Sequence, residues 1–316
     1  MKIKLITPAS PGARNGNRIT AVRWARILKR LGHQVTTAQR YDGAPCDLMI
    51  ALHARRSFDS IRRFRDKHPQ LPLIVALTGT DLYHDIRTDR HARESLELAT
   101  RLIVLQAKAL ADLPKRLHPK TRVIYQSAAT RKGRPPAVRD GFRVCVIGHL
   151  RPEKDPMCTA LAARRLPASS RVRVLHIGRA LTREMKKLAR VEAARNERYR
   201  WVGELPHWKT RRFLAGCQLL SLTSRMEGSS NALCEAIVSS VPVVASKIPG
   251  LIGTLGENYP GYFPVGNTRA LARLLLRAES DPQFYRRLKA HCAKLRSFVD
   301  PARERAAWKK LLAELD

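Results

Sequence analysis

The fold is decided by the stretch Leu219-Leu-Ser-Leu-Thr-Ser-Arg-Met-Glu-Gly-Ser-Ser-Asn-Ala-Leu-Cys-Glu-Ala-Ile237. Residues 219–222 are typical of a short apolar strand, and a helical pattern begins after the Gly-Ser-Ser turn. The first backbone N–H groups of a helix have no partner within the helix, so this turn is suited to bind a phosphate. The stretch therefore predicts a strand–turn–helix unit of an α/β protein.

Similar apolar runs alternate with helical patterns along most of the 316 residues. Short, continuous apolar strands separated by helices predict parallel sheets that are covered on both faces. The strands that we expect are Lys2–Thr7, Gln34–Ala38, Asp47–Leu52, Leu73–Leu77, Arg101–Leu105, Arg122–Tyr125, Phe142–Ile147, Val172–Ile177, Tyr199–Val202, Leu219–Leu222 and Val241–Ala245.

The alternation stops once, in a polar and proline-rich stretch. We expect a first Rossmann-like domain over residues 1–130, a linker over 131–141 and a second Rossmann-like domain over 142–299. Two doubly wound domains place a cleft at the carboxyl ends of their strands. The final amphipathic run, about residues 300–316, is a candidate to pack back on the first domain.

Two carboxylates flank the turn in the opening stretch. Glu227 precedes the turn, and Glu235 lies about two helical turns further on, so both can face one cleft. The alternative is that both are ordinary surface glutamates near a helix start. Their position directly after a strand favours a binding site.

The motif Glu-Gly-x-x-Asn-x-Leu-x-Glu-Ala, followed by Pro-Val-Val-Ala, resembles the donor-site signature of the retaining GT-B glycosyltransferases of family 4. The resemblance extends over most of the chain. Ile147–Asp155 resembles the phosphate loop of that family, Val202–Leu205 the turn that holds the nucleotide base, and Val123–Gln126 the strand before the linker. The resemblance implies a GT-B fold and transfer of a sugar from a nucleotide.

The resemblance also implies roles for single residues. Glu227 would bind hydroxyls of the donor sugar, and Glu235 would bind the ribose. Lys154 would neutralise charge on the departing diphosphate, together with Arg151, because His149 occupies the place where the family usually has arginine. The remaining donor-site residues implied are Gly148, Glu204, Leu205, Gly228, Ser229, Ser230 and Asn231.

No metal or other cofactor is expected. The chain has no Asp-x-Asp motif, and its six cysteines are scattered without clustered histidines. Cationic side chains would then neutralise the diphosphate. The scattered cysteines predict neither a disulfide framework nor a zinc site.

The first domain departs from the family pattern after a buried strand, in Leu77-Thr-Gly-Thr-Asp-Leu-Tyr-His84. Thr78 stands where the family has a histidine, and threonine is no general base without an activating partner. Thr78, Asp81 and His84 are candidate acceptor contacts, and the alternative for Asp81 and His84 is that they simply stabilise the turn. An acceptor that is already an anion would need no base.

A second anion site is predicted in the first strand–helix loop, for an acceptor. The alternative is a solvated surface loop. The candidate residues in this loop are Gly12, Arg14, Asn15, Gly16, Asn17 and Arg18.

The segments Thr7–Thr20, Gln39–Gly43, Ala51–Ser57 and Leu77–Tyr83 resemble a narrow bacterial branch of the family, the selenosugar synthases of selenoneine biosynthesis. That resemblance implies transfer from a UDP-sugar, chiefly UDP-N-acetylglucosamine, to selenophosphate, with formation of a carbon–selenium bond. The alternatives are a family 4 enzyme that acts on a hydroxyl of a sugar or lipid, and an inactive module that binds sugar nucleotides or nucleic acid.

The net charge is +34, and the positive excess is spread evenly. Residues 1–142 carry 28 basic and 11 acidic side chains, and residues 143–316 carry 32 and 15. An even distribution without a basic arm argues against a dedicated nucleic-acid binder and fits small anionic substrates. No apolar run is long enough for a membrane span or a signal peptide, so we expect a cytoplasmic protein.

The four tryptophans are far apart in the sequence, and we expect them in the core of the protein.

Overall fold

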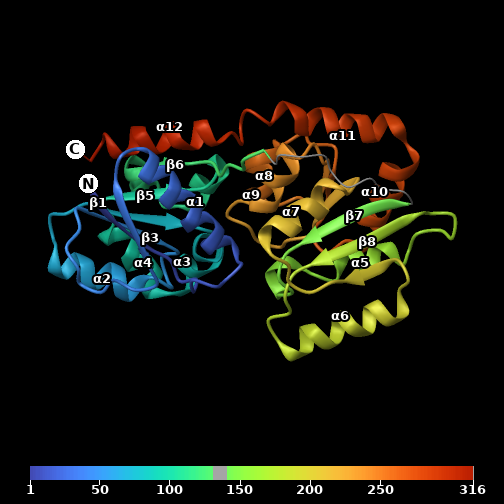
Figure 1. Ribbon diagram of the computed structural model, residues 1–316, viewed down its shortest axis with the longest axis horizontal. Helices are drawn as coiled ribbons and strands as arrows, with labels where there is room; N and C mark the ends of the chain where they lie inside the picture. Colours follow the sequence, from blue (N-terminus) through green and yellow to red (C-terminus); the bar gives the residue numbers. More distant parts are fainter. Residues whose placement is uncertain (131–140, 316) are drawn as a thin grey trace. The chain divides into compact units, whose positions relative to one another are not determined.

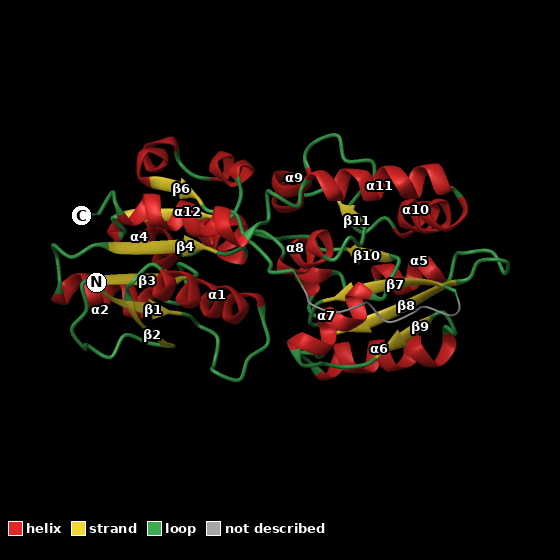
Figure 2. Ribbon diagram, turned by 45° about the horizontal axis from the view of Figure 1, so that its top comes forward, coloured by secondary structure: helices red, strands yellow, loops and turns green. Residues whose placement is uncertain are grey.

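The computed structural model describes residues 1–130 and 141–315, so the predicted linker lies outside the described residues except for Gly141. The chain divides into two compact units. Unit 1 contains Met1–Ser127, Glu227–Asn231 and the segment from Asp300 onward, and unit 2 contains Ala128–Met226 and Ala232–Val299. Each unit holds one six-stranded parallel sheet with flanking helices, which confirms the predicted α/β fold (Figure 2).

Unit 1 is built on a sheet in the order β2-β1-β3-β4-β5-β6. The chain passes from β1 to β2 on one side and returns to β3 on the other, so the strand order reverses between β1 and β3. Ligands of open α/β sheets bind beside the carboxyl ends of the strands at such a switch point. The strands are β1 (Lys2–Ile6), β2 (Gln34–Ala38), β3 (Leu48–Leu52), β4 (Leu73–Leu77), β5 (Arg101–Val104) and β6 (Thr121–Val123).

Both faces of this sheet are buried, which explains the continuous apolar runs. Along β3, Leu48, Ile50 and Leu52 belong to the core beneath α1 and α12, whereas Met49 and Ala51 belong to the core beneath α2 and α4. The helices of unit 1 are α1 (Gly16–Arg30), α2 (Phe58–Lys67), α3 (Ile86–Thr88), α4 (Arg90–Leu98) and α12 (Pro301–Leu312). Shorter turns are the π-helix η1 (Asp81–Asp85) and the 3₁₀ turns η2 (Ala107–Asp112) and η3 (Lys115–Lys120).

The C-terminal helix α12 packs on unit 1, beside α1 (Figure 1). Trp308 is fully buried and meets Trp24 of α1 edge to face, with ring centroids 4.9 Å apart. The buried carboxylate of Glu304 accepts hydrogen bonds from Trp24 Nε1 at 2.7 Å and Arg23 Nε at 2.9 Å. A buried charge is tolerated when it is paired and hydrogen-bonded, so Glu304 fixes the position of α12.

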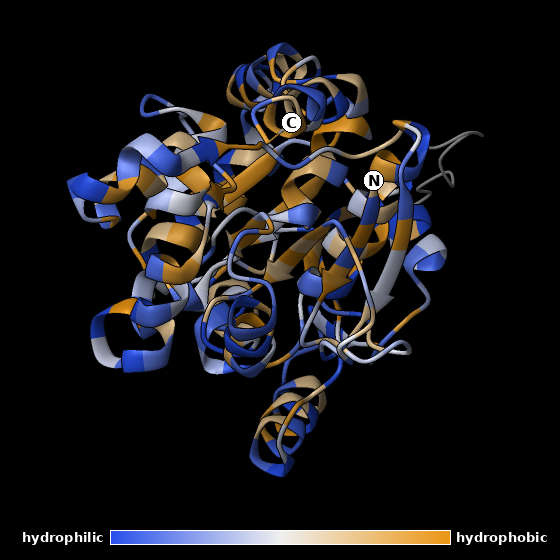
Figure 3. Ribbon diagram, turned by 90° about the vertical axis from the view of Figure 1, so that its left-hand side faces the viewer, coloured by the Kyte–Doolittle hydropathy of each residue, from blue (hydrophilic) through white to orange (hydrophobic). Residues whose placement is uncertain are grey.

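Unit 2 is built on a sheet in the order β12-β11-β10-β7-β8-β9, and its strand order reverses between β7 and β10. In Figure 3 the strands at the centre of the sheets are mainly orange, the colour of hydrophobic residues. The strands are β7 (Phe142–Ile147), β8 (Val172–Ile177), β9 (Tyr199–Trp201), β10 (Leu219–Leu222), β11 (Val243–Ser246) and β12 (Tyr262–Phe263). The helices are the 3₁₀ turn η4 (Pro152–Lys154), α5 (Cys158–Ala163), α6 (Arg183–Arg195), α7 (His207–Ala215), α8 (Asn231–Val238), α9 (Pro249–Leu255), α10 (Thr268–Ser280) and α11 (Pro282–Lys294).

The structure tests two further predictions. All six cysteines are buried and free, including Cys46, Cys145, Cys217 and Cys234, which the sequence places in or beside apolar runs. The expectation that every tryptophan lies in the core is wrong for Trp208, whose relative exposure is 61%. Trp208 is the second residue of α7 and lies on its exposed face. Across the described residues, no helix is both long and apolar enough to cross a membrane.

Candidate active site

The switch point of unit 2 holds a small pocket at the carboxyl ends of β7 and β10. These two strands are neighbours in the sheet, and their continuations form the walls. The pocket is lined by Val146, Ile147, Gly148, Lys154, Pro156, His176, Ser221, Leu222, Thr223 and Ser224. Two of the predicted donor-site residues, Gly148 and Lys154, are therefore brought together at the place where the topology predicts a ligand.

Glycine is required where β7 and β8 end. A Cβ atom at Gly178 would lie 1.8 Å from the carbonyl oxygen of Gly148, a distance that no side chain tolerates. Gly148 itself has Lys154 across it, because a Cβ atom there would lie 3.7 Å from Cγ and Cδ of the lysine. The aliphatic part of the lysine side chain therefore lies against the end of β7.

His176 of β8 supports this loop from inside the unit. Its Nε2 lies 3.2 Å from the carbonyl oxygen of Gly148, and its Nδ1 lies 2.9 Å from the Tyr199 hydroxyl. Burial lowers the pKa of His176 to about 4, so the ring is neutral at pH 7. The neutral tautomer that satisfies both contacts donates from Nε2 to the carbonyl and accepts from the tyrosine.

The turn that carries Lys154 is tied to the end of β10. The Thr223 hydroxyl donates to the carbonyl oxygens of Lys154 at 2.8 Å and of Asp155 at 3.0 Å. Asp155 has a φ of 44°, in the left-handed region, and its carboxylate lies 3.1 Å from Arg225. These bonds fix the backbone of the predicted phosphate loop against the strand that leads to Glu227.

Cationic residues surround His149, in the loop after β7. Burial lowers the pKa of His149, while Glu204 acts in the opposite direction with its carboxylate 3.7 Å from Nε2. Arg179, Arg151 and Lys154 lower the pKa further by their positive charges. The loops after β7 and β8 thus gather three cations, of which sequence reasoning missed Arg179, although it directly follows a predicted strand and Gly178.

The turn predicted to hold the base and the helix α8 both belong to unit 2, and one hydrogen bond beside that turn reaches α8. Glu204 and Leu205 lie in the turn between β9 and α7, and Glu235 lies inside α8. His207, the first residue of α7, is 2.6 Å from Glu235, measured from Nε2 to Oε1. The sequence analysis did not single out His207, because no periodic pattern shows that two residues 28 positions apart touch.

The remaining predicted donor residues form the connection from β10 to α8. Glu227 precedes this turn, and α8 begins at Asn231, as the sequence predicts. Gly228, Ser229 and Ser230 complete the connection. In this strand–turn–helix arrangement the residues that start α8 follow the carboxyl end of β10.

The predicted acceptor loop of unit 1 lies between β1 and α1, at the switch point of that sheet. Asn15 caps α1, because its side chain accepts a hydrogen bond from the N–H of Arg18 at 3.0 Å. Gly16 and Asn17 form the first turn of α1, Gly12 and Arg14 are exposed, and Arg18 is half-buried. Asn15 thus has a structural role, and the two arginines remain available to solvent.

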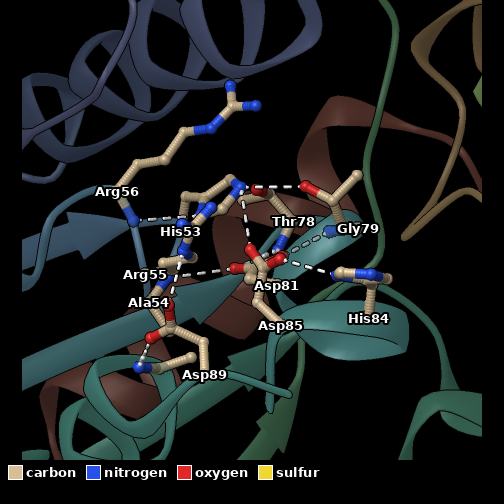
Figure 4. Close-up of polar contacts among 12 residues, drawn as sticks. His53, Ala54, Arg55, Arg56, Thr78, Gly79, Asp81, His84, Asp85 and Asp89 are labelled. Atoms are coloured by element: carbon tan, nitrogen blue, oxygen red, sulfur yellow. Dashed lines mark hydrogen bonds and ion pairs between the residues drawn. The ribbon is translucent and has the colours of Figure 1, made fainter. Parts of the chain in front are cut away.

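The turn after β4 is organised around Asp81, as Figure 4 shows. Its fully buried carboxylate accepts hydrogen bonds from the backbone N–H groups of Thr78 at 2.9 Å, Gly79 at 2.7 Å and Ala54 at 3.1 Å. A carboxylate with three backbone donors holds the turn that presents Thr78. His84 is exposed at the end of this segment, with Nδ1 3.1 Å from Asp85.

His53 is a candidate site residue that the sequence analysis did not single out. It directly follows β3, is buried, and has a φ of 72°, which is rare for a residue other than glycine. Its Nδ1 accepts from the N–H of Arg56 at 3.3 Å, so Nε2 carries the proton toward Thr80 Oγ1 at 2.9 Å. Burial lowers the pKa of His53. A buried neutral histidine with a strained backbone beside a switch point is typical of a functional site.

The described part of the chain contains no group of three or more His, Cys, Asp or Glu side chains arranged to hold a metal ion.

Comparison with known proteins identifies a family and a set of solved structures with the same fold. A family model described as glycosyl transferases group 1 matches residues 130–294, slightly more than half of the chain. No curated protein matches the sequence.

Solved structures share the fold of the whole chain at low identity. HepE from Anabaena, in complex with UDP and glucose, is 18% identical with a TM-score of 0.77, and all of both chains is covered. Sucrose-phosphate synthase from Thermosynechococcus elongatus is 16% identical with a TM-score of 0.82, covering 99% of this chain and 98% of that one. The pneumococcal O-GlcNAc transferase GtfA, in complex with UDP and GlcNAc, is 16% identical with a TM-score of 0.66, covering 93% and 60%. The fold is the one that the sequence predicts.

Proposed function

The chain belongs to the glycosyl transferases group 1, and from this premise we propose that it transfers a sugar from a UDP-sugar, chiefly UDP-N-acetylglucosamine, to selenophosphate. The observation that carries the donor half of the proposal is the edge of unit 2 between β7 and β10. There a small pocket and three cations come together at a switch point. The similar structures of HepE and GtfA, both in complex with UDP, support the choice of nucleotide.

In this proposal Lys154, Arg151 and Arg179 neutralise the diphosphate. As the bond between the anomeric carbon and the UDP oxygen breaks, negative charge develops on the leaving group, and fixed cations stabilise it. The N–H groups from Gly228 to Asn231, at the start of α8, are suited to bind phosphate. Glu227 binds the sugar hydroxyls, and the Glu235 carboxylate accepts hydrogen bonds from the ribose.

The acceptor half rests on unit 1. Thr78 stands where a histidine base is expected, and the exposed Arg14 belongs to the loop at the switch point of that sheet. An acceptor that is already an anion is bound by positively charged side chains and does not need a base to remove a proton from it. The selenium atom of selenophosphate would form the bond to the anomeric carbon while UDP leaves, and water would then cleave the phosphorus–selenium bond to release phosphate.

In this proposal the positive charges of Lys154, Arg151 and Arg179 neutralise the diphosphate, so that no metal ion is needed for this role. EDTA is therefore expected to leave the activity unchanged, measured as UDP release with and without chelator. Loss of activity that magnesium restores would contradict this part of the proposal.

The six free cysteines fit a reducing compartment such as the cytoplasm.

The acceptor is tested by incubating the protein with UDP-N-acetylglucosamine and selenophosphate, with simple sugars and alcohols as parallel acceptors. UDP release together with a selenium-bearing sugar detected by mass supports the proposal. Transfer to a hydroxyl, without a selenosugar, would support the ordinary family enzyme instead. Absence of UDP release with every acceptor would favour an inactive binding module.

A further inference from the structure

A hydrogen-bonded pair of side chains joins α7 to α8 in unit 2. His207 Nε2 lies 2.6 Å from Glu235 Oε1. The two side chains differ in exposure: that of His207 is 51% exposed, and that of Glu235 only 8%. One partner is therefore anchored in the unit, and the other reaches it from the surface.

The pair is needed because Glu235 is a carboxylate in an apolar helix. Leu233, Cys234, Ala236 and Ile237 around it are all buried. A buried carboxylate is costly unless it accepts hydrogen bonds, and the imidazole N–H is the donor, since a carboxylate has none. His207 therefore holds one oxygen of Glu235 in place.

The pair also lies between two segments that the proposed donor site already uses. His207 begins α7, two residues after Leu205 in the turn predicted to hold the nucleotide base. Glu235 belongs to α8, which follows the phosphate-binding turn. A nucleotide that contacts both segments brings its ribose near the link between them.

Resting on the proposed function, we propose that His207 is a positioning residue that orients Glu235 toward the ribose diol and thereby sets the preference for ribonucleotides. A carboxylate can accept about four hydrogen bonds. The N–H of His207 occupies one of these acceptor positions, on Oε1. The remaining positions of the Glu235 carboxylate would accept hydrogen bonds from the two neighbouring hydroxyls of the ribose. Without His207 the carboxylate is free to rotate and loses this alignment.

The test is a cycle of two ligands and two proteins, measured by calorimetry at one pH and one salt concentration. UDP and 2′-deoxy-UDP are titrated into wild-type protein and into His207→Ala. The wild type is expected to bind UDP more tightly than 2′-deoxy-UDP. The variant should lose about tenfold in UDP affinity but much less in 2′-deoxy-UDP affinity, so the preference collapses. A general disturbance of α7 would weaken both ligands equally.

Two further variants complete the design. His207→Gln keeps an N–H donor for Glu235 and should restore most of the preference. Lys209→Ala removes a neighbouring exposed cation of α7 and should leave the ratio of the two affinities unchanged. This variant shows whether loss of a positive charge on α7 is by itself enough to change the preference for UDP.

The outcomes separate this inference from the proposed function. If the wild type binds no UDP, the proposed donor site is wrong and the inference falls with it. If it binds UDP but His207→Ala keeps the same preference, or if the wild type shows no preference, only the inference is overturned. In turnover assays the expected change is a raised KM for the UDP-sugar with kcat nearly unchanged.

Discussion

Acidification should destabilise unit 2 through one buried side chain, His176. Its ring is neutral in the folded protein, with a pKa of about 4 against 6.5 for an unperturbed histidine, because burial disfavours the charged form. The unfolded chain therefore binds a proton in a pH range where the folded protein does not. Because this folded pKa is depressed, the stabilisation present above pH 6.5 is lost as the pH falls toward 4.

The magnitude follows from the two pKa values. At 1.36 kcal/mol per pKa unit, the contribution of His176 falls by about 2 kcal/mol between pH 7 and pH 5, and by about 3 kcal/mol at pH 4. In the variant His176→Gln, an amide can still donate to the carbonyl of Gly148 but does not titrate. The variant is expected to be less stable than the wild type at pH 7 and to lose less stability on acidification.

The assay must report on unit 2 alone, because a two-unit chain need not unfold in one step. Pulsed hydrogen exchange along a urea series, read on peptides from β7 and β8, gives the free energy of unfolding of that unit. The fall in this free energy between pH 7 and pH 5 should be about 2 kcal/mol larger in the wild type than in His176→Gln. An equal fall in the two proteins would refute the assignment of a neutral, buried His176.

Other variants test the packing and the proposed chemistry. Trp308→Ala should lower the free energy of unfolding of unit 1 by about 3–5 kcal/mol, measured by hydrogen exchange, whereas the exposed Trp208→Ala should change stability by less than about 0.5 kcal/mol. Lys154→Ala should reduce kcat about 100-fold or more in a UDP-release assay, and a smaller loss would remove the lysine from charge stabilisation. Replacing both Arg14 and Arg18 by alanine should raise the KM for selenophosphate but not for the UDP-sugar. Added salt should produce part of the same rise, and a KM that is insensitive to both changes would contradict an acceptor site in this loop.

The strands were predictable because they are continuous apolar runs. Leu73–Leu77, Phe142–Ile147 and Val172–Ile177 have the predicted bounds, since most residues of each run are apolar. The exceptions are Arg143, Arg173 and His176. The strand predicted at Val241 begins instead at Val243, beyond Pro242, which has no N–H to donate to a neighbouring strand. The two-residue strand Tyr262–Phe263 is too short to give a pattern.

The site was predictable where a residue belongs to a local motif and not where it depends on tertiary contacts. Gly148 and Lys154 follow one strand within a few residues, so their position at its carboxyl end was evident. The pairing of His207 with Glu235 and the contact of His53 with Thr80 join segments that are distant in the sequence. The residue types around His53 do not indicate that its φ is positive. Its position directly after a buried strand is visible in the sequence and would have identified it as a candidate.

The central claim is that unit 2 binds the nucleotide of a UDP-sugar through Glu235. The most direct measurement is a calorimetric titration of UDP into wild-type protein and Glu235→Ala. Removing a carboxylate that holds ribose hydroxyls should cost about 1.5–3 kcal/mol, a rise in Kd of roughly ten- to 150-fold, with the fold intact by circular dichroism. An unchanged Kd for UDP, or no binding to the wild type, would contradict the claim.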